Sequence, residues 1–153
     1  MLSLYIIMDQ QQQPPRESNE TTDNTSQPNT EFSLKFTESG GLNNRYLLVS
    51  YNSKTKTISS STDVSGSNVK HKLLSESKER ELIEAIRTNE FFNTRTDYPP
   101  EKEDESLIAY TLAITMGDSV HTTAWTDESK GIPECVKEIV SEIKKILSEE
   151  KII

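Results

Sequence analysis

Residues 82–116 place an acidic loop between two apolar stretches. The pair Phe91 and Phe92 closes the first stretch, and four carboxylates fall within residues 101–105. A compact domain can bury two phenylalanines, but it cannot bury four carboxylates without partners. We therefore interpret the apolar flanks as scaffold and the acidic run as a loop presented at the surface.

Alternation of apolar and polar residues predicts strands on both sides of this segment. Gly40 and Gly41 should interrupt the first strand with a turn, and Gly117 with Asp118 should form a hairpin turn. The polar segment 61–70 is expected to be a mobile loop, and Tyr98 should lie in a turn with Pro99 and Pro100. The expected strands are residues 32–37, 46–51, 57–60, 107–116 and 120–126.

Two segments have the spacing of amphipathic helices. The first should begin at Ser75 as N-cap and end near Asn89, and the second should begin at Pro133. In the second helix the apolar residues recur every three or four positions, at Val136, Ile139, Val140, Ile143, Ile146 and Leu147. The predicted fold class is α+β, an antiparallel sheet of about four to five strands packed with two helices.

The N-terminal segment has a different composition from the rest. Residues 9–30 contain no aliphatic or aromatic side chain, and the whole chain is only 32% hydrophobic. Such a segment buries too little apolar surface to offset the entropy lost on ordering. We expect a disordered tail over residues 1–31 and a single α+β domain over residues 32–153.

Charge and cysteine content exclude several classes of protein. The net charge of −8 repels phosphate backbones and anionic membranes, so neither nucleic acid nor membrane is an expected partner. Cys135 is the single cysteine, which excludes an intramolecular disulfide. The apolar start, residues 2–8, is too short for the core of a signal peptide. We expect a soluble, monomeric, cytoplasmic protein, with secretion as the alternative.

The sequence contains no recognisable catalytic motif. His71 and His121 stand in different elements, without cysteines or paired acids at metal-ligand spacing. Ser39 precedes two glycines, a pattern typical of a turn, and Cys135 is best interpreted as a half-buried structural thiol. We therefore expect no enzymatic activity, no catalytic residues, no cofactor and no metal site of the protein's own.

The acidic run has two interpretations. It is either a solvated loop, or it offers a carboxylate to something outside the protein. A loop braced by Pro99 and Pro100 loses less entropy when it docks, and zinc accepts Asp and Glu oxygens as ligands. The second interpretation makes the protein a ligand of another molecule.

The order of several motifs resembles the emfourin family. The motifs are Phe-Thr-Glu-Ser-Gly-Gly-Leu at 36–42, Leu-Ile-Glu-Ala-Ile at 82–86, Phe91-Phe92, Tyr-Pro-Pro before the acidic loop, Tyr-Thr-Leu-Ala-Ile at 110–114 and the terminal amphipathic helix. That family comprises small protein inhibitors of thermolysin-like zinc metallopeptidases, the protealysin type in particular. The resemblance covers residues 32–147.

This resemblance implies that two neighbouring loops enter a protease cleft. One would be the turn Ser39, Gly40, Gly41 and Leu42, with Leu42 filling an apolar subsite. The other would be Glu103, Asp104, Glu105 and Ser106. The family places an acid four residues before the strand tyrosine, where this chain has Ser106. Either the loop is shifted in register, with Asp104 as the preferred ligand of the protease zinc, or inhibition is weakened or lost in this chain. The alternative is a non-inhibitory interaction module that uses the same loops or the last helix.

Overall fold

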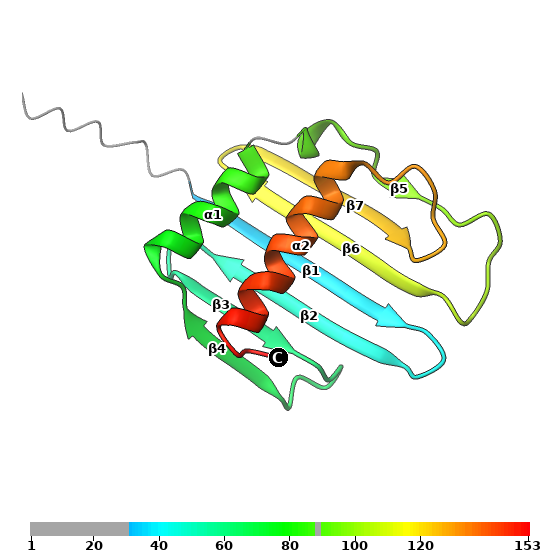
Figure 1. Cartoon of the computed structure of the whole chain (residues 1–153), viewed down its shortest axis with the longest axis horizontal. Coiled ribbons are helices and arrows are strands. Elements are labelled where there is room, and N and C mark those ends of the chain that lie inside the picture. Colours follow the sequence, from blue (N-terminus) through cyan, green and yellow to red (C-terminus); the bar gives the residue numbers. More distant parts are fainter. Residues whose placement is uncertain (1–30, 88–89) are drawn as a thin grey trace, which may run out of the picture.

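The computed structural model describes residues 31–87 and 90–153, in which two helices cover one face of a seven-stranded sheet (Figure 1). The strand order is β4-β3-β2-β1-β6-β7-β5. The strands are β1 Phe32–Gly40, β2 Arg45–Asn52, β3 Thr57–Ser61, β4 Val69–Leu73, β5 Asp97–Tyr98, β6 Ile108–Met116 and β7 Ser119–Thr126. The helices are α1 Glu76–Arg87, α2 Glu134–Glu149 and the short 3-10 helix η1 Phe91–Asn93. Apart from residue 31, the predicted tail lies outside the described residues.

The α+β class is confirmed, but the strand count of four to five is wrong because two strands were missed. β4 has only two apolar residues, Val69 and Leu73, at its two ends, and all five of its residues are exposed, so the apolar signal of a half-buried strand is weak. Its first two residues fall in the segment predicted as a loop. β5 falls partly in the predicted turn at Tyr98, and it pairs in parallel with β7. The sheet is therefore mixed, although every other pairing is antiparallel.

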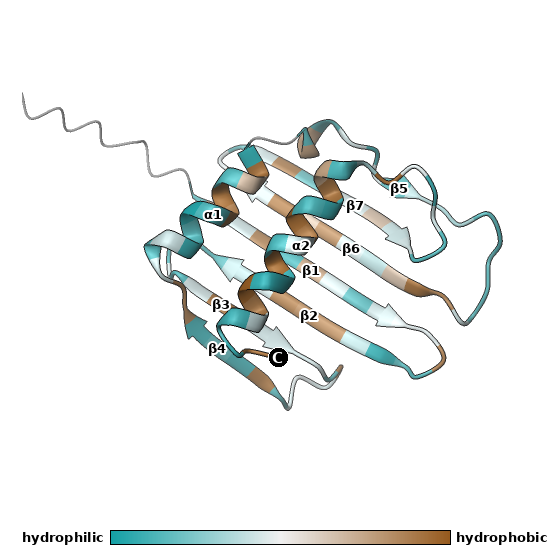
Figure 2. Cartoon of the chain, in the orientation of Figure 1, coloured by the Kyte–Doolittle hydropathy of each residue, from teal (hydrophilic) through white to brown (hydrophobic). Residues whose placement is uncertain are grey.

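Strand alternation gives the sheet one apolar face. Phe32, Leu34 and Phe36 of β1 are buried beneath the helices, and Leu34 and Phe36 lie opposite Ile114 and Leu112 of β6. Figure 2 shows apolar residues along α2 and on the strands below it. The strand predicted over residues 107–116 corresponds to β6, which contributes the buried Leu112 and Ile114 to this face. The hairpin at Gly117 is also confirmed, because Met116 pairs with Ser119.

Both predicted helices are present. The Lys78 N–H donates to Ser75 Oγ at 3.3 Å, which confirms Ser75 as the N-cap of α1. The predicted end near Asn89 lies outside the described residues. Pro133 directly precedes α2 with an extended backbone, and the stripe predicted on α2 faces the core. Its buried members are Val136, Ile139, Ile143, Ile146 and Leu147, whereas Val140 is half-buried.

The phenylalanine pair provides a test of this core. Phe91 is fully buried and packs edge-on against His121, whereas Phe92 is half-buried. Phe91→Ala should lower the free energy of unfolding by about 3–5 kcal/mol, through lost burial and the cavity left behind. Urea denaturation measures this change. Phe92→Ala is the matched control and should cost less; an equal cost would contradict the packing described.

Candidate functional site

The turn between β1 and β2 is narrower than the sequence predicted. Ser39 and Gly40 continue β1 and pair with Tyr46 and Arg45 of β2, so the glycines do not interrupt the strand where expected. The turn itself covers residues 41–44, and the Asn44 N–H donates to the Gly41 carbonyl at 3.1 Å. Leu42 lies at the tip and is 88% exposed. An apolar side chain is thus held away from the core on a short turn.

The acidic loop runs from the end of β5 to the start of β6. The Ser106 N–H donates to Asp104 Oδ1 at 2.8 Å, and the Leu107 N–H donates to the Asp104 carbonyl at 3.2 Å. The bond from the Ser106 N–H, and a second one from the Ser106 hydroxyl, hold the pKa of the Asp104 carboxyl below its ordinary value. Asp104 is exposed, as are Glu103 and Glu105, while Ser106 is half-buried. Asp104 is therefore an oriented, ionised carboxylate at the surface.

The structure places the two loops side by side, at the same end of the sheet (Figure 1). The Gly41 N–H donates to the Leu107 carbonyl at 3.0 Å, and Gly40 pairs with Ile108 across β1 and β6. Gly40 has a φ of +101°, and a Cβ atom there would lie 2.7 Å from the Leu107 carbonyl oxygen. The backbones approach so closely that only glycine fits. The juxtaposition that the two-loop hypothesis requires is therefore present.

A buried carboxylate behind the first turn was not predicted. Glu38 occupies the next inward position after Phe36 and is only 3% exposed. Its Oε1 lies 2.8 Å from Arg45 Nη1, and its Oε2 lies 3.0 Å from Lys144 Nζ of α2. The Glu38–Arg45 pair spans the turn that carries Leu42, and so it stiffens that turn. The sequence feature that could have identified this buried carboxylate is an acid at an inward-facing position of an alternating strand.

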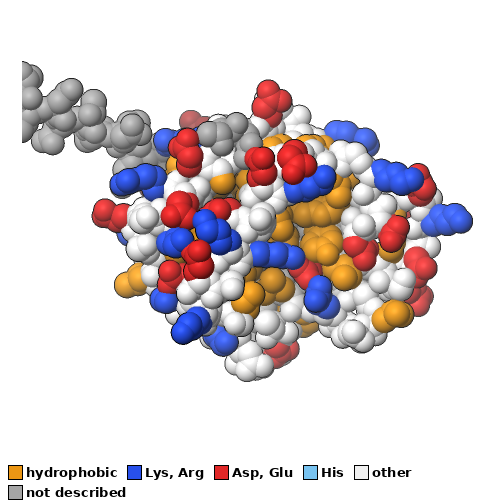
Figure 3. All heavy atoms as spheres, viewed as in Figure 1, with side chains coloured by type: hydrophobic (Ala, Val, Ile, Leu, Met, Phe, Trp, Pro, Cys, Tyr) orange, Lys and Arg blue, Asp and Glu red, His pale blue; other side chains and the backbone are white. Residues whose placement is uncertain are grey.

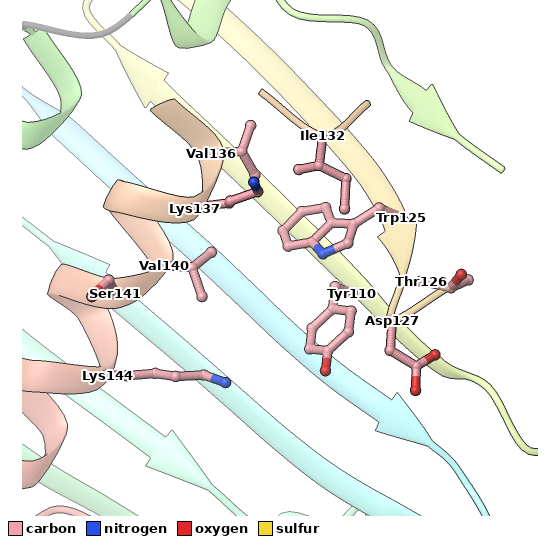
Figure 4. Close-up of a pocket in the computed structure, with 10 residues that line it drawn as sticks. All are labelled: Tyr110, Trp125, Thr126, Asp127, Ile132, Val136, Lys137, Val140, Ser141 and Lys144. Carbon is pink, nitrogen blue, oxygen red and sulfur yellow. The ribbon is translucent and has the colours of Figure 1, made fainter. Parts of the chain in front are cut away.

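A groove lies beside these charges, between α2 and strands β6 and β7. It encloses about 460 Å³, and Figure 3 shows the apolar hollow. Tyr110 and Trp125 form its floor as a stacked pair, with ring centroids 5.4 Å apart. Figure 4 shows Val140 and Lys144 reaching toward these rings from α2. No sequence pattern identified this groove, because its residues come from three separate elements.

The two histidines and the cysteine considered as candidate residues do not form a site. His71 Nδ1 lies 2.7 Å from Ser59 Oγ across two strands, and His121 Nε2 lies 2.9 Å from Thr94 Oγ1. Burial raises the pKa of the Cys135 thiol, which makes it less reactive at neutral pH. Within residues 31–87 and 90–153, no group of three or more His, Cys, Asp or Glu side chains is arranged to hold a metal ion.

No protein-family model and no curated protein sequence matches this chain. None of the helices in the described part of the chain is both long and apolar enough to cross a lipid bilayer.

The close approach of the loops can be tested with two matched glycines. Gly40→Ala should destabilise the protein by about 2–4 kcal/mol, because it combines backbone strain with a clash at Leu107. Gly131 also has a positive φ, of +72°, but nothing lies within 4 Å of its added Cβ. Gly131→Ala should therefore cost only about 1–2 kcal/mol. Thermal unfolding compares the two, and equal losses would contradict a tight contact.

The Asp104 turn should have a defined pH dependence. The folded pKa lies below the ordinary value of 3.8, so the fold favours the ionised form. The resulting stabilisation is present above pH 3.8 and is lost as the pH falls through the lowered pKa. We expect the Ser106 amide shift, followed by NMR, to titrate with a midpoint below 3.8. Asp104→Asn should abolish the step, whereas a midpoint at or above the ordinary value would contradict the turn.

Proposed function

We propose that the protein is a stoichiometric inhibitor of a thermolysin-like zinc metallopeptidase. Both loops would enter the active-site cleft together. The observation that carries the proposal is the hydrogen bond from the Gly41 N–H to the Leu107 carbonyl, at 3.0 Å. It joins a turn with an exposed leucine to a loop with an exposed aspartate. The motif resemblance to emfourins is the source of this two-loop mechanism.

Asp104 is the proposed zinc ligand. Its carboxylate stays ionised at neutral pH because its pKa is low, and Ser106 restrains Oδ1. Asp104 is exposed, so its carboxylate can be approached by a metal from outside the protein. A catalytic zinc held by three protein ligands keeps its fourth position open for water, and a carboxylate there would displace the water that the protease must activate. Asp104 would thus block catalysis without entering the reaction.

Leu42 is the proposed apolar anchor. At 88% exposed it gains from burial in a hydrophobic subsite, by about 1.5–3 kcal/mol for a fully buried leucine. The turn that carries it is fixed by the bond to Leu107 and by the Glu38–Arg45 ion pair. A loop that is already ordered loses little entropy on binding. The same rigidity makes the two loops poor substrates, because cleavage requires an extended, adaptable chain.

The test is a titration of thermolysin activity with the purified protein. Inhibition should be complete near one equivalent when the concentrations exceed Kd. Asp104→Ala and Leu42→Asp should each weaken inhibition about tenfold or more, through loss of a charged contact or of apolar burial. Asp118→Ala and Val120→Asp are matched controls at the opposite end of the sheet, and both should inhibit like the wild type.

Zinc-depleted thermolysin separates the metal contact from the rest of the interface. The wild type and Asp104→Ala should bind the zinc-free protease with equal affinity, measured by calorimetry, because only the metal distinguishes them. The proposal fails if excess wild-type protein leaves several thermolysin-like proteases fully active. A partner search that returned no protease, with loop variants behaving as wild type, would then favour the non-inhibitory interaction module.

A further inference from the structure

The groove between α2 and strands β6 and β7 has the character of a second binding site, separate from the two loops. Its volume is about 460 Å³, and its lining combines apolar and aromatic side chains with several polar and charged ones. Pockets that bind small molecules span about 300–1,000 Å³ and combine apolar walls with a few converging polar groups. We propose that this groove binds a small amphipathic monoanion, an apolar body with one carboxylate at its end.

The apolar body would lie along the aromatic floor. Tyr110 and Trp125 stack at an interplanar angle of 11°, and Ile132, Val136 and Val140 close the sides. Trp125 is 9% exposed, so its remaining accessible surface opens into the groove. An alkyl chain or a single ring would cover this surface. Because apolar surface leaves water there, such contact is the main source of affinity.

The polar groups around this floor are mainly hydrogen-bond donors. Lys144 Nζ lies 5.9 Å from the centroid of the Tyr110 ring. Burial and the charges of Glu38 and Asp127 raise the pKa of Tyr110, so its hydroxyl stays protonated. Among the described residues, none accepts a hydrogen bond from the Trp125 indole N–H. These three donors would suit a carboxylate, which is purely an acceptor.

The local charge also favours an anion. Glu38 is the one carboxylate shared by Arg45 and Lys144, so this cluster keeps an excess positive charge beside the groove. Glu38 Oε2 accepts no aligned hydrogen bond, so the amine of Lys144 is held there by charge alone. Among the residues that line the groove, Lys137 and Lys144 carry two positive charges and Asp127 carries one negative charge, so the lining itself is positive. A protein with a net charge of −8 would otherwise repel anions.

The chain offers a built-in reporter of occupancy. Trp125 is the only tryptophan, so its emission reports on this groove alone. Octanoate, octanol and octylammonium share one alkyl chain and differ only in the end group. Octanoate should change the emission of the full-length protein with a saturable curve, octanol should bind about tenfold more weakly, and octylammonium should bind weakest. Equal binding of all three, or no saturable change, would overturn the proposal.

Variants locate the site. Lys144→Gln should weaken octanoate binding about tenfold, and the exposed Lys70→Gln on β4 is the matched control without effect. Because Lys144 also contacts buried Glu38, Ser141→Glu on the exposed rim is a second variant that leaves the core intact. It should weaken octanoate and strengthen octylammonium, whereas Ser141→Gln should change neither. If Ser141→Glu bound octanoate and octylammonium as the wild type does, these probes would bind elsewhere on the protein, and the proposal would be overturned.

This proposal stands apart from protease inhibition. The two Ser141 variants should inhibit thermolysin like the wild type, since Ser141 lies on neither loop and, unlike Lys144, does not contact Glu38. If octanoate bound but the protein did not inhibit thermolysin, the groove would still be a binding site and the inhibitor hypothesis would fail. If the groove instead bound a segment of a protein, the NMR amide shifts that change on binding would extend beyond β6, β7 and α2. That result would count against a small ligand.

Discussion

The antiparallel pairing of β1 with β6 determines most of this structure. It runs without interruption from Phe32 opposite Met116 to Gly40 opposite Ile108, and it joins segments that are far apart in the chain. In its middle it builds the core, because Phe36 and Leu112 pair there and are both fully buried. At one end it brings two loops together. A shift of one residue would turn the apolar set of β1 to the solvent side, so the burial that stabilises the core also fixes the loops.

Much of the fold follows from local pattern. The helices could be predicted because Ser75 supplies a cap and because α2 repeats its apolar residues at helical spacing. The strands β1, β2, β3, β6 and β7 could be predicted from alternation or β propensity. β4 could not, since it has no buried residue, and its strand character comes from pairing with β3. β5 is two residues long and depends on hydrogen bonds to β7. Tertiary pairing, rather than propensity, makes both of these strands.

The candidate site was likewise predictable from the sequence only in part. Leu42 and the acidic run are visible as an apolar residue beside glycines and as a charge cluster. Their proximity is not visible, because it depends on the register between β1 and β6. Glu38 is an acid at an inward-facing position of an alternating strand, and the ion pairs with Arg45 and Lys144 compensate for its burial. The groove at Tyr110 and Trp125 needed coordinates, since it exists only where α2 leaves part of the sheet uncovered.

The outer strands bear on how the molecule behaves in a crowded solution. An exposed sheet border invites further strands to add, and natural proteins discourage this with lysines or with very short final strands. Here the β4 border carries Lys70 and Lys72, and the opposite border is a two-residue strand followed by an isolated bridge between Pro100 and Ser129. Neither border is an inviting template for fibril growth. A scaffold that presents two firm loops can thereby reach high concentration without its sheet extending from chain to chain.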